Sequence, residues 1–269
     1  MDSLLNDLKY TYTYRFFRSL YLQIINWLEM IGYIGANFYH SLKYILTFNL
    51  NRKMLIEQAS RFGVDSLPLT LSIVGLTGMI IALQVANEMV KQGAGDYVGM
   101  LVTVAIIREL GPIMGSFAII SMIGSSMAAE VGTMKVTEQV DAIKVLGVDP
   151  IQYLIVPRIL AGFFIMPFVI ILANLVGILG GLLSSNIVTE LGVLTYIESV
   201  WRGLGERDLT VTLIKSCVFG GLIALISTSI GYKTEGGAID VGKSTTQAVV
   251  WSFIAVVVVD YLITLIFYG

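Results

Sequence analysis

The residues of this sequence that could do chemistry are a few charges inside long apolar stretches. Arg108 and Glu109 are adjacent within an apolar run over residues 97–126. A charge at the centre of a bilayer costs about 2.5–3.5 kcal/mol on insertion scales, so it marks a functional or paired position. Neighbouring helical residues point roughly 100° apart and cannot simply neutralise each other. We expect one of the two to face the protein interior and the other a cavity, either in a substrate pathway or in a structural ion pair.

Pro112 follows this charged pair after three residues. Proline has no N–H, so the carbonyl of Arg108 loses the partner that a regular helix would give it. Inside a membrane an unpaired carbonyl must be satisfied by another group of the protein. The sequence therefore predicts a kink beside Arg108 and a second partner for its carbonyl.

Two further charges lie in the last two apolar runs. Lys215 comes six residues after Leu209, and Asp260 comes eight residues before Tyr268. Both positions are then reached from the same side of the membrane at a similar depth. Opposite charges at one depth on consecutive helices are natural partners. We predict an ion pair between Lys215 and Asp260, which would either tie the two helices together or take part in gating.

Residues 237–244 read GAIDVGKS, which matches the phosphate-binding pattern G-x-x-x-x-G-K-[ST]. That pattern binds nucleotide only between a buried strand and a helix of an α/β domain. Here it occupies a short connection between two apolar runs, so we expect no nucleotide site. We expect Ser244 and Thr245 to cap the helix that follows.

Other chemistries are disfavoured by composition. The single Cys217 and the single His40 leave too few ligands for a zinc site and no partner for a disulfide. A net charge of −2 argues against nucleic acid as a partner. We therefore expect no metal, no cofactor and no nucleic acid.

The elements that must position these charges are membrane spans. Of the 269 residues, 56% are hydrophobic and only 13% are charged, whereas a soluble domain carries about 25% charged residues. About 20 apolar residues cross the hydrocarbon core as a helix. The sequence predicts an all-α polytopic membrane protein with five spans, over residues 67–90, 97–126, 159–189, 209–232 and 245–268. Residues 67–269 would form the transmembrane domain, with a loop over residues 190–208.

The distribution of basic residues predicts the orientation. With the N-terminus in the cytoplasm, the outer segments hold only Lys91, Arg202 and Arg207. The inner segments then hold twelve bases: Lys9, Arg15, Arg18, Lys43, Arg52, Lys53, Arg61, Lys135, Lys144, Arg158, Lys233 and Lys243. Cytoplasmic loops of membrane proteins are enriched in Lys and Arg. The N-terminus is therefore predicted inside and the C-terminus outside.

Residues 1–66 form the second predicted unit. Apolar side chains recur there at helical spacing, at Phe16, Phe17, Leu20, Ile24, Leu28 and Ile31. Bases and many aromatic residues lie between them, as is typical of a helix that lies in the membrane interface. We favour an interfacial amphipathic helix over residues 10–48. The alternative is an additional span, which would spoil the charge asymmetry.

Between the second and third spans, residues 130–150 read as one exposed cytoplasmic helix. Its apolar face would hold Val136, Val140, Ile143 and Gly147. Charged side chains lie on its other faces, at Glu130, Lys135, Glu138, Asp141 and Lys144. A short amphipathic helix here either docks onto a soluble partner or only connects two spans. Glycine pairs spaced G-x-x-x-G, at Gly111 and Gly115 and at Gly177 and Gly181, predict close helix contacts within one chain or across a dimer.

The segment RELGPIMGSFAIISMIGSSMAAEVGTMKVTEQVDAIKVLGVDPIQYLIVPR, which begins at Arg108, resembles the core of the MlaE permease family. The resemblance extends from about residue 67 to the C-terminus, through IKS at residues 214–216 and VDYLIT at residues 259–264. It implies an ABC transporter that moves phospholipid between the inner and outer membranes. Two permease copies would pair with two ATPase subunits inside and a ring of MCE-domain proteins outside, in the inner membrane of a bacterium.

The same resemblance implies roles for individual residues. It places the coupling helix at residues 130–148, with Glu130, Lys135, Glu138, Gln139 and Asp141 toward the ATPase. It implies that spans one, two and five line an apolar cavity shared by the dimer, with lipid contacts at Ile81, Gln84, Arg108, Glu109 and Leu110. Glu88 and Gln92 make the outer mouth of that cavity more polar than the family pattern, and Gln247 stands where some relatives carry a base.

Three kinds of function remain as hypotheses. The first is a permease for phospholipid, or for another apolar cargo such as a sterol, that hydrolyses no ATP itself. The second is an intramembrane enzyme, for which the sequence offers Glu109 and Asp260 but no nucleophile beside a base. The third is a passive channel or scaffold. ATP-dependent transport that requires a partner subunit would favour the first hypothesis.

Overall fold

The computed structural model describes residues 2–46, 52–189 and 192–269, with side chains from Phe17 onward except those of residues 188 and 189. The described residues form helices, several of them joined end to end through π-helical turns. In order they are α1 Asp2–Leu46, α2 Arg52–Ser60, η1 Arg61–Asp65, α3 Leu67–Lys91, η2 Gly95–Tyr97, α4 Val98–Ala105, η3 Ile106–Leu110, α5 Gly111–Ile119, η4 Ile120–Gly124, α6 Ser125–Val136, α7 Gln139–Val145, η5 Ile151–Ile155, α8 Val156–Thr189, α9 Val193–Gly203, α10 Glu206–Tyr232 and α11 Ala238–Tyr268.

Five helical stretches of the described chain are long and apolar enough to cross a membrane: Arg52–Lys91, Gly95–Val136, Ile151–Ile187, Glu206–Tyr232 and Ala238–Tyr268. The predicted all-α fold with five spans is thus confirmed. The first stretch begins earlier than predicted, because α2 and η1 lead directly into α3. The predicted division of the chain at residue 66 falls inside this stretch.

Small residues allow the spans to pack closely. A Cβ atom on Gly162 of α8 would lie too near the backbone of Gly220 in α10, and the reverse is also true. Gly78 of α3 meets the backbone of Gly177 in α8 in the same way. Only a hydrogen atom fits between these backbones, so the helices can approach closely along their length. In a membrane such close packing stabilises helix pairs through dispersion contacts, because moving an apolar surface out of lipid gives no hydrophobic gain. The contacts of Gly177 lie within one chain.

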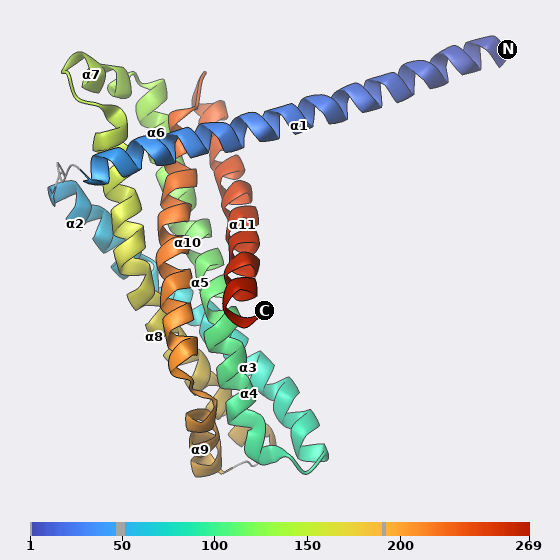
Figure 1. Ribbon diagram of the computed structural model, residues 1–269, viewed down its shortest axis with the longest axis vertical. Coiled ribbons are helices and arrows are strands. Elements are labelled where there is room, and N and C mark those ends of the chain that lie inside the picture. The colour runs from blue at the N-terminus through green and yellow to red at the C-terminus, as the bar shows by residue number, and fades with distance from the viewer. Residues whose placement is uncertain (1, 47–51, 190–191) are drawn as a thin grey trace.

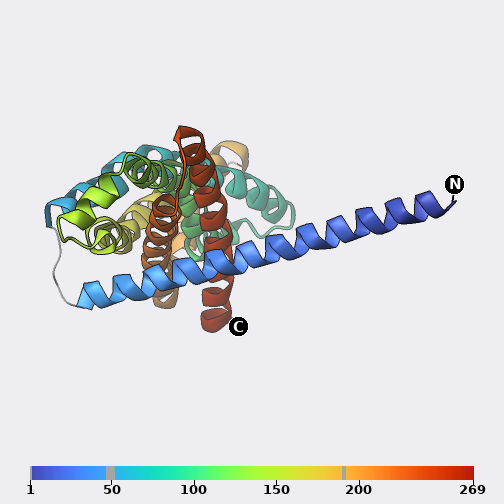
Figure 2. The same ribbon diagram turned by 90° about the horizontal axis from the view of Figure 1, so that it is seen from above.

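Helix α1 runs across the other helices near one end of the bundle and extends far beyond them (Figures 1 and 2). Its apolar side chains Phe17, Leu20, Ile24, Leu28 and Ile31 are all exposed, and α1 is not among the candidate spans. Phe16 lies outside the described side chains. A crosswise helix with an uncovered apolar stripe suits the membrane interface, so the interfacial location remains our prediction.

Two expectations about connections are wrong. The segment over residues 130–150 is not one helix, because α6 ends at Val136 and α7 begins at Gln139, with Glu138 in the left-handed region at φ 59°. Residues 190–208 are not a simple loop either, since Val193–Gly203 forms α9. Helices α7 and α9 lie at opposite ends of the bundle (Figure 1).

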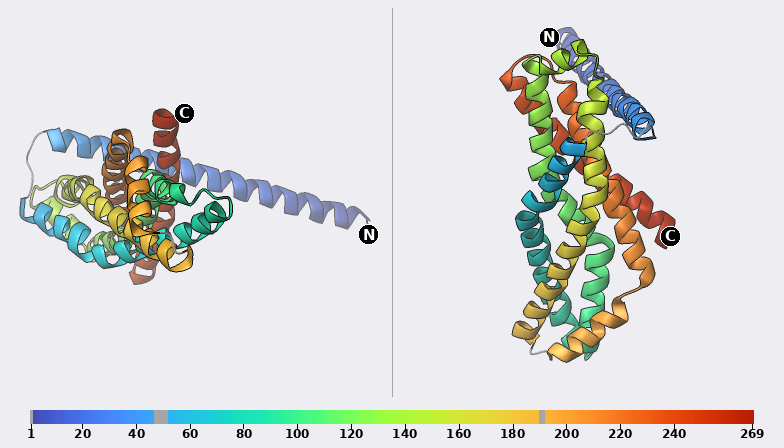
Figure 3. Two further views of the ribbon diagram at one scale, coloured as in Figure 1. Left: turned by 90° about the horizontal axis from the view of Figure 1, so that it is seen from below. Right: turned by 90° about the vertical axis from the view of Figure 1, so that its left-hand side faces the viewer.

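Helix α11 is the least enclosed of the spans. In the most apolar part of α11, 17% of the residues are buried, whereas 56% are buried in the corresponding parts of the third span and of α10. Its C-terminal end projects past the other helices (Figure 3), while its Asp260, Thr264 and Tyr268 side chains contact α10 and η3. The uncovered large apolar residues of α11 are Ile239, Val250, Ile254, Val257, Val258, Tyr261, Leu262, Leu265 and Ile266.

Candidate functional site

The second span is interrupted at its charged residues by a π-helical turn, η3. The N–H of Gly111 reaches back to the carbonyl of Ile106, and Pro112 has no N–H to donate. The carbonyls of Ile107 and Arg108 are thereby left for other partners. The hydroxyl of Thr212 donates to the carbonyl of Ile107, and Lys215 Nζ donates to the carbonyl of Arg108 over 2.8 Å. The predicted second partner of the Arg108 carbonyl is thus confirmed, and α10 supplies it.

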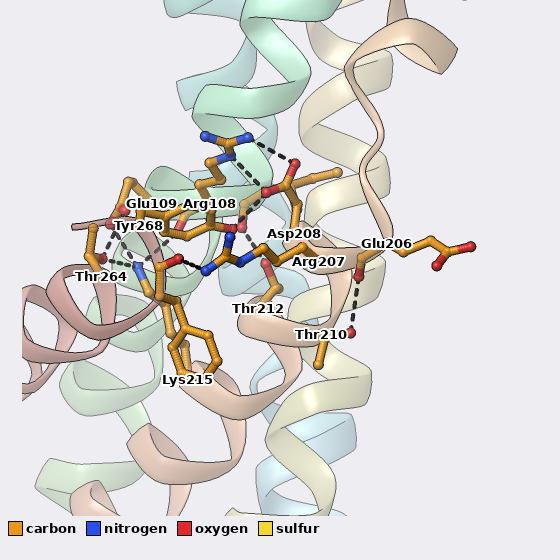
Figure 4. A network of polar contacts seen from close by, with 12 residues as sticks. Arg108, Glu109, Glu206, Arg207, Asp208, Thr210, Thr212, Lys215, Thr264 and Tyr268 are labelled. Carbon is orange, nitrogen blue, oxygen red and sulfur yellow. Dashed lines mark hydrogen bonds and ion pairs between the residues drawn. The ribbon is translucent and has the colours of Figure 1, made fainter.

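Lys215 is the centre of the cluster, and its side chain is fully buried. Its ammonium lies 2.8 Å from Glu109 Oε2, 2.8 Å from Asp260 Oδ1 and 2.8 Å from Thr264 Oγ1. With the Arg108 carbonyl this makes four oxygen neighbours for three N–H groups. Thr264 in turn donates to Glu109 Oε1 over 3.0 Å. One cation therefore holds two carboxylates from different spans. Figure 4 shows Lys215 with Glu109 and Thr264 around it.

Arg108 turns away from Glu109 and pairs with Asp208, which is 4% exposed, in the first turn of α10. Its Nε lies 2.8 Å from Asp208 Oδ1 and its Nη2 lies 3.2 Å from Oδ2, a two-point contact. The ring of Tyr268 lies 4.6 Å below the guanidinium, and its hydroxyl donates to Asp208 over 2.7 Å. Sequence reasoning missed Asp208, because it fell at the end of the predicted loop over residues 190–208 and was not considered as a partner of a charge inside the spans.

These contacts join spans two, four and five at one level (Figure 4). Arg108 and Lys215 carry two positive charges against three negative charges on Glu109, Asp208 and Asp260. A buried charge that loses its partner is costly, so the cluster fixes the register of the three spans. We refer to Arg108, Glu109, Asp208, Lys215 and Asp260 as the charge cluster.

The other residues expected at a lipid site lie outside this cluster. Ile81 is half-buried and Gln84 is exposed, both on α3, and the side chain of Gln84 makes no hydrogen bond within the described part of the chain. Leu110 is half-buried at the end of η3. A groove of about 630 Å³ opens on a different face, between α8, α9 and α10. The single chain therefore brings Arg108 and Glu109 into one network and leaves Gln84 on the surface of the first span.

At the end of the bundle that carries α7, Glu130 holds two arginines. Its carboxylate lies 2.6 Å from Arg61 Nη1 and 3.1 Å from Arg158 Nη2. Arg158 is fully buried in α8 and also donates to the carbonyl of Leu154 over 2.7 Å. A buried guanidinium needs a counter-ion, which explains why Glu130 points inward.

Beyond Glu130, charged contacts set the angle between α6 and α7. Asp141 of α7 lies 3.2 Å from Lys135 Nζ of α6 and 2.9 Å from Lys144 Nζ. Hydrogen bonds from Lys144 and then Lys135 lower the pKa of Asp141, and the bond to Asp141 raises the pKa of Lys144. Glu138 and Gln139 stand exposed at the bend.

The segment that matches a phosphate loop is helical. Gly237 precedes α11, and the N–H of Gly237 donates to Asp240 Oδ2 over 3.2 Å. Lys243 pairs with Asp240 over 2.8 Å. The expectation that Ser244 and Thr245 cap this helix is wrong. The helix begins at Ala238, and the side chain of Asp240 accepts the hydrogen bond from the backbone N–H just before it.

Comparison with known proteins decides the class of this arrangement. A family model described as Permease MlaE matches residues 55–266. The chain belongs to the MlaE permease family. The match includes the charge cluster, the α6–α7 connection and all but the start of the first span. Like other MlaE permeases, this chain is a multi-pass membrane subunit of an ABC transporter and is not itself catalytic.

Relatives of this MlaE permease carry similar names. A probable ABC transporter permease protein of Synechocystis sp. is 38% identical over 227 residues, which cover 84% of this chain and 86% of the relative. One of Rickettsia prowazekii is 33% identical over 244 residues, covering 91% and 94%. The chloroplastic protein Trigalactosyldiacylglycerol 1 of Arabidopsis thaliana is 36% identical over 224 residues, covering 83% of this chain and 64% of the relative. An ABC permease works with a separate ATPase, so this chain has such a partner.

Proposed function

We propose that this permease moves phospholipids between the inner and outer membranes of a bacterium, as a homodimer with two ATPase subunits and a ring of MCE-domain proteins. The observation that supports phospholipid as the cargo is the 36% identity to a protein named after a glycerolipid, trigalactosyldiacylglycerol. The basic residues favour a location in the inner membrane with the N-terminus in the cytoplasm and the C-terminus in the periplasm.

The uncovered face of α11 supports a dimer and an apolar path for lipid. A span packed on one side only leaves the other side for lipid or for a second protein helix. In our proposal the two copies face each other through spans one, two and five. Ile81 and Gln84 of α3 and Arg108, Glu109 and Leu110 of η3 then contact lipid. Glu109 is 36% exposed at its side chain and so can meet a ligand while it is bound to Lys215.

The α6–α7 connection supports a docking site for the ATPase. Val145 and Leu146 are 88% and 79% exposed, next to charged residues at the cytoplasmic end of the bundle. Apolar side chains exposed to water beside polar ones are typical of a protein interface. We assign Glu138, Gln139 and the Lys135–Asp141 pair to this interface.

Glu130 has a different part in the proposal. It lies in α6, before the bend, and links α6 to Arg61 of the first span and to Arg158 of the third span. Movement of α7 by a closing ATPase would pass through Glu130 to these spans. The lipid cavity would then change between two states whose balance the nucleotide sets. No covalent chemistry is required of this chain.

Affinity purification of the tagged chain from its native membrane, with mass spectrometry of bound proteins and lipids, tests the proposal. We expect an ATPase subunit, an MCE-domain protein and phospholipid to co-purify. An ATPase with a different bound cargo, such as a sterol, would refute the phospholipid assignment and leave the permease assignment intact. Glu138→Ala should reduce the recovery of the ATPase, whereas Arg202→Ala, at the opposite end of the bundle, should not.

A further inference from the structure

We propose that a slot between α1 and α11 is a second lipid site, which binds a zwitterionic glycerophospholipid of the cytoplasmic leaflet with an ammonium headgroup. Two adjoining cavities of about 560 and 350 Å³ form this α1–α11 slot. Both are lined by Asn26 and Met30 of α1 and by Lys243 and Gln247 of α11. In Figure 1 the two helices cross at the end of the bundle that carries α6 and α7.

One end of the slot is apolar and aromatic. Trp27 and Trp251 come from the two helices, and their ring centroids lie 4.5 Å apart. Met30 and Val250 complete this end, and Trp27 remains 47% exposed. Tryptophan is enriched where a membrane passes from hydrocarbon to headgroups. An acyl chain fits this wall, and an ion or a free headgroup has nothing to bind there.

The other end of the slot carries charges of both signs. Lys233 and Lys243 provide two ammonium groups, and Glu29, Glu235 and Asp240 provide three carboxylates. Asp240 is bound to Lys243 over 2.8 Å, whereas Glu29 and Glu235 form no ion pair within the described part of the chain. A purely anionic headgroup would be repelled by the excess of carboxylates over ammonium groups at this end of the slot. A headgroup that carries both a phosphate and an ammonium can place the first beside the lysines and the second beside the carboxylates.

The dimensions and the amide groups agree with this ligand. From Asp240 to Trp251, α11 rises eleven residues, or roughly 16 Å at 1.5 Å per residue. That length covers a headgroup, a glycerol backbone and the start of an acyl chain. Asn26 and Gln247 line both cavities, and neither side chain makes a hydrogen bond within the described residues. They stand where the ester groups of the lipid would lie.

The inference concerns binding and does not depend on transport, so it can fail or hold separately from the proposed function. The test uses the full chain with its co-purifying partners in nanodiscs that contain phosphatidylethanolamine with a diazirine in one acyl chain. After illumination without ATP, labelled peptides are identified by mass spectrometry. We expect residues 24–30 and 247–254 to be labelled more than the lipid-facing residues around Leu172 of α8.

Competition defines the ligand. Unlabelled phosphatidylethanolamine should suppress the labelling, phosphatidylglycerol should suppress it less well, and glycerophosphoethanolamine, which has no acyl chains, should not suppress it. Equal competition by both lipids would overturn the assigned headgroup. Suppression by the chainless compound would show a headgroup or phosphate site and overturn the lipid site.

Variants define the place. Gln247→Trp fills the slot and should reduce labelling of residues 247–254 at least fivefold, while the matched Leu172→Trp on α8 should leave it unchanged. Lys243→Gln, at an exposed position, should reduce it roughly threefold, as expected for one exposed charged contact. Labelling that is even over all spans, or insensitive to both slot variants, would overturn the proposal. A slot peptide crosslinked to a partner protein in place of lipid would assign the slot to a transmembrane helix and equally overturn it.

Discussion

Replacing Lys215 by methionine removes the one cation that lies between Glu109 and Asp260 while keeping a side chain of similar length. Each carboxylate oxygen lies 2.8 Å from the same Nζ, so the two oxygens are at most 2.8 + 2.8 = 5.6 Å apart. At an effective dielectric constant of about 20, two like charges at that distance repel by about 3 kcal/mol. The variant also loses both attractions, and breaking a buried pair costs about 3–5 kcal/mol.

The expected order of variants is set by the charges. Lys215→Met leaves two carboxylates together and should be destabilised by about 3 kcal/mol or more. Asp260→Asn leaves Lys215 with Glu109 and should be destabilised far less. In the double variant Lys215→Met with Asp260→Asn, Glu109 is the one carboxylate left beside residue 215. The repulsion between Glu109 and Asp260 is then gone, so the double variant should be more stable than Lys215→Met alone. That reversal is the signature of a coupled cluster.

Thermal unfolding in detergent with a thiol-reactive fluorophore measures these differences, because Cys217 is the only cysteine and lies partly buried on α10. A loss of about 3 kcal/mol corresponds to roughly 6–12 °C in melting temperature for a chain of this size. Lys91→Met is the matched control, since Lys91 pairs with Glu88 at 3.1 Å on the surface. It should change the melting temperature by less than about 2 °C. If Lys215→Met melts no lower than this control, the reasoning is refuted.

Three other perturbations test separate parts of the fold. Glu130→Gln leaves Arg158 buried with a weaker partner and should lower the melting temperature, whereas Glu130→Gln with Arg158→Met should recover part of the loss; equal melting of both would contradict the assigned pair. Gly162→Val forces α8 away from the backbone of Gly220 and should abolish the folded chain, seen as loss of a monodisperse peak in size-exclusion chromatography; normal recovery would rule out the close contact. Glu138→Gly relieves the left-handed backbone and should raise the melting temperature slightly while it lowers lipid-stimulated ATP hydrolysis of the assembled transporter; a lower melting temperature would argue against strain at Glu138.

The spans could be predicted from the sequence because the bilayer leaves few alternatives. A run of some 20 apolar residues must cross as a helix, and α3 begins at Leu67 as its apolar run does. That the Arg108 carbonyl needs a new partner could also be predicted, although not that Lys215 supplies it, since Pro112 removes an N–H wherever the helix lies. Both predictions rest on rules that hold without knowledge of neighbouring helices.

The partners of Arg108 and Glu109 inside the charge cluster could not be predicted in the same way, whereas Lys215 and Asp260 were expected to pair from their shared depth and lie 2.8 Å apart. The π-helical turn at η3 adds a residue to one helical turn and so rotates the rest of the span by roughly 100°. Which way Arg108 and Glu109 point depends on that rotation. Asp208 became the partner of Arg108 because α10 begins at Glu206 and brings its first turn beside η3. Nothing in the local sequence marks this long-range contact.

The bend at Glu138 is a further case. Periodicity favoured one helix over residues 130–150, since a left-handed non-glycine residue has no local signature. Burial of Val140 against the bundle and the contact between Lys135 and Asp141 stabilise the bent form. The apolar residues of α9 were assigned to a loop because the helix is short and lies between two spans.

In our proposal this chain moves phospholipid when a partner ATPase closes on the α6–α7 connection. Reconstitution of the purified transporter in liposomes, with fluorescent phospholipid transferred to or from an acceptor MCE-domain protein, measures it directly. We expect transfer that requires ATP, that falls when Glu138 is replaced by alanine, and that persists with Arg202→Ala. Transfer at the same rate without ATP, or ATP-driven transfer that ignores the Glu138 substitution, would contradict it.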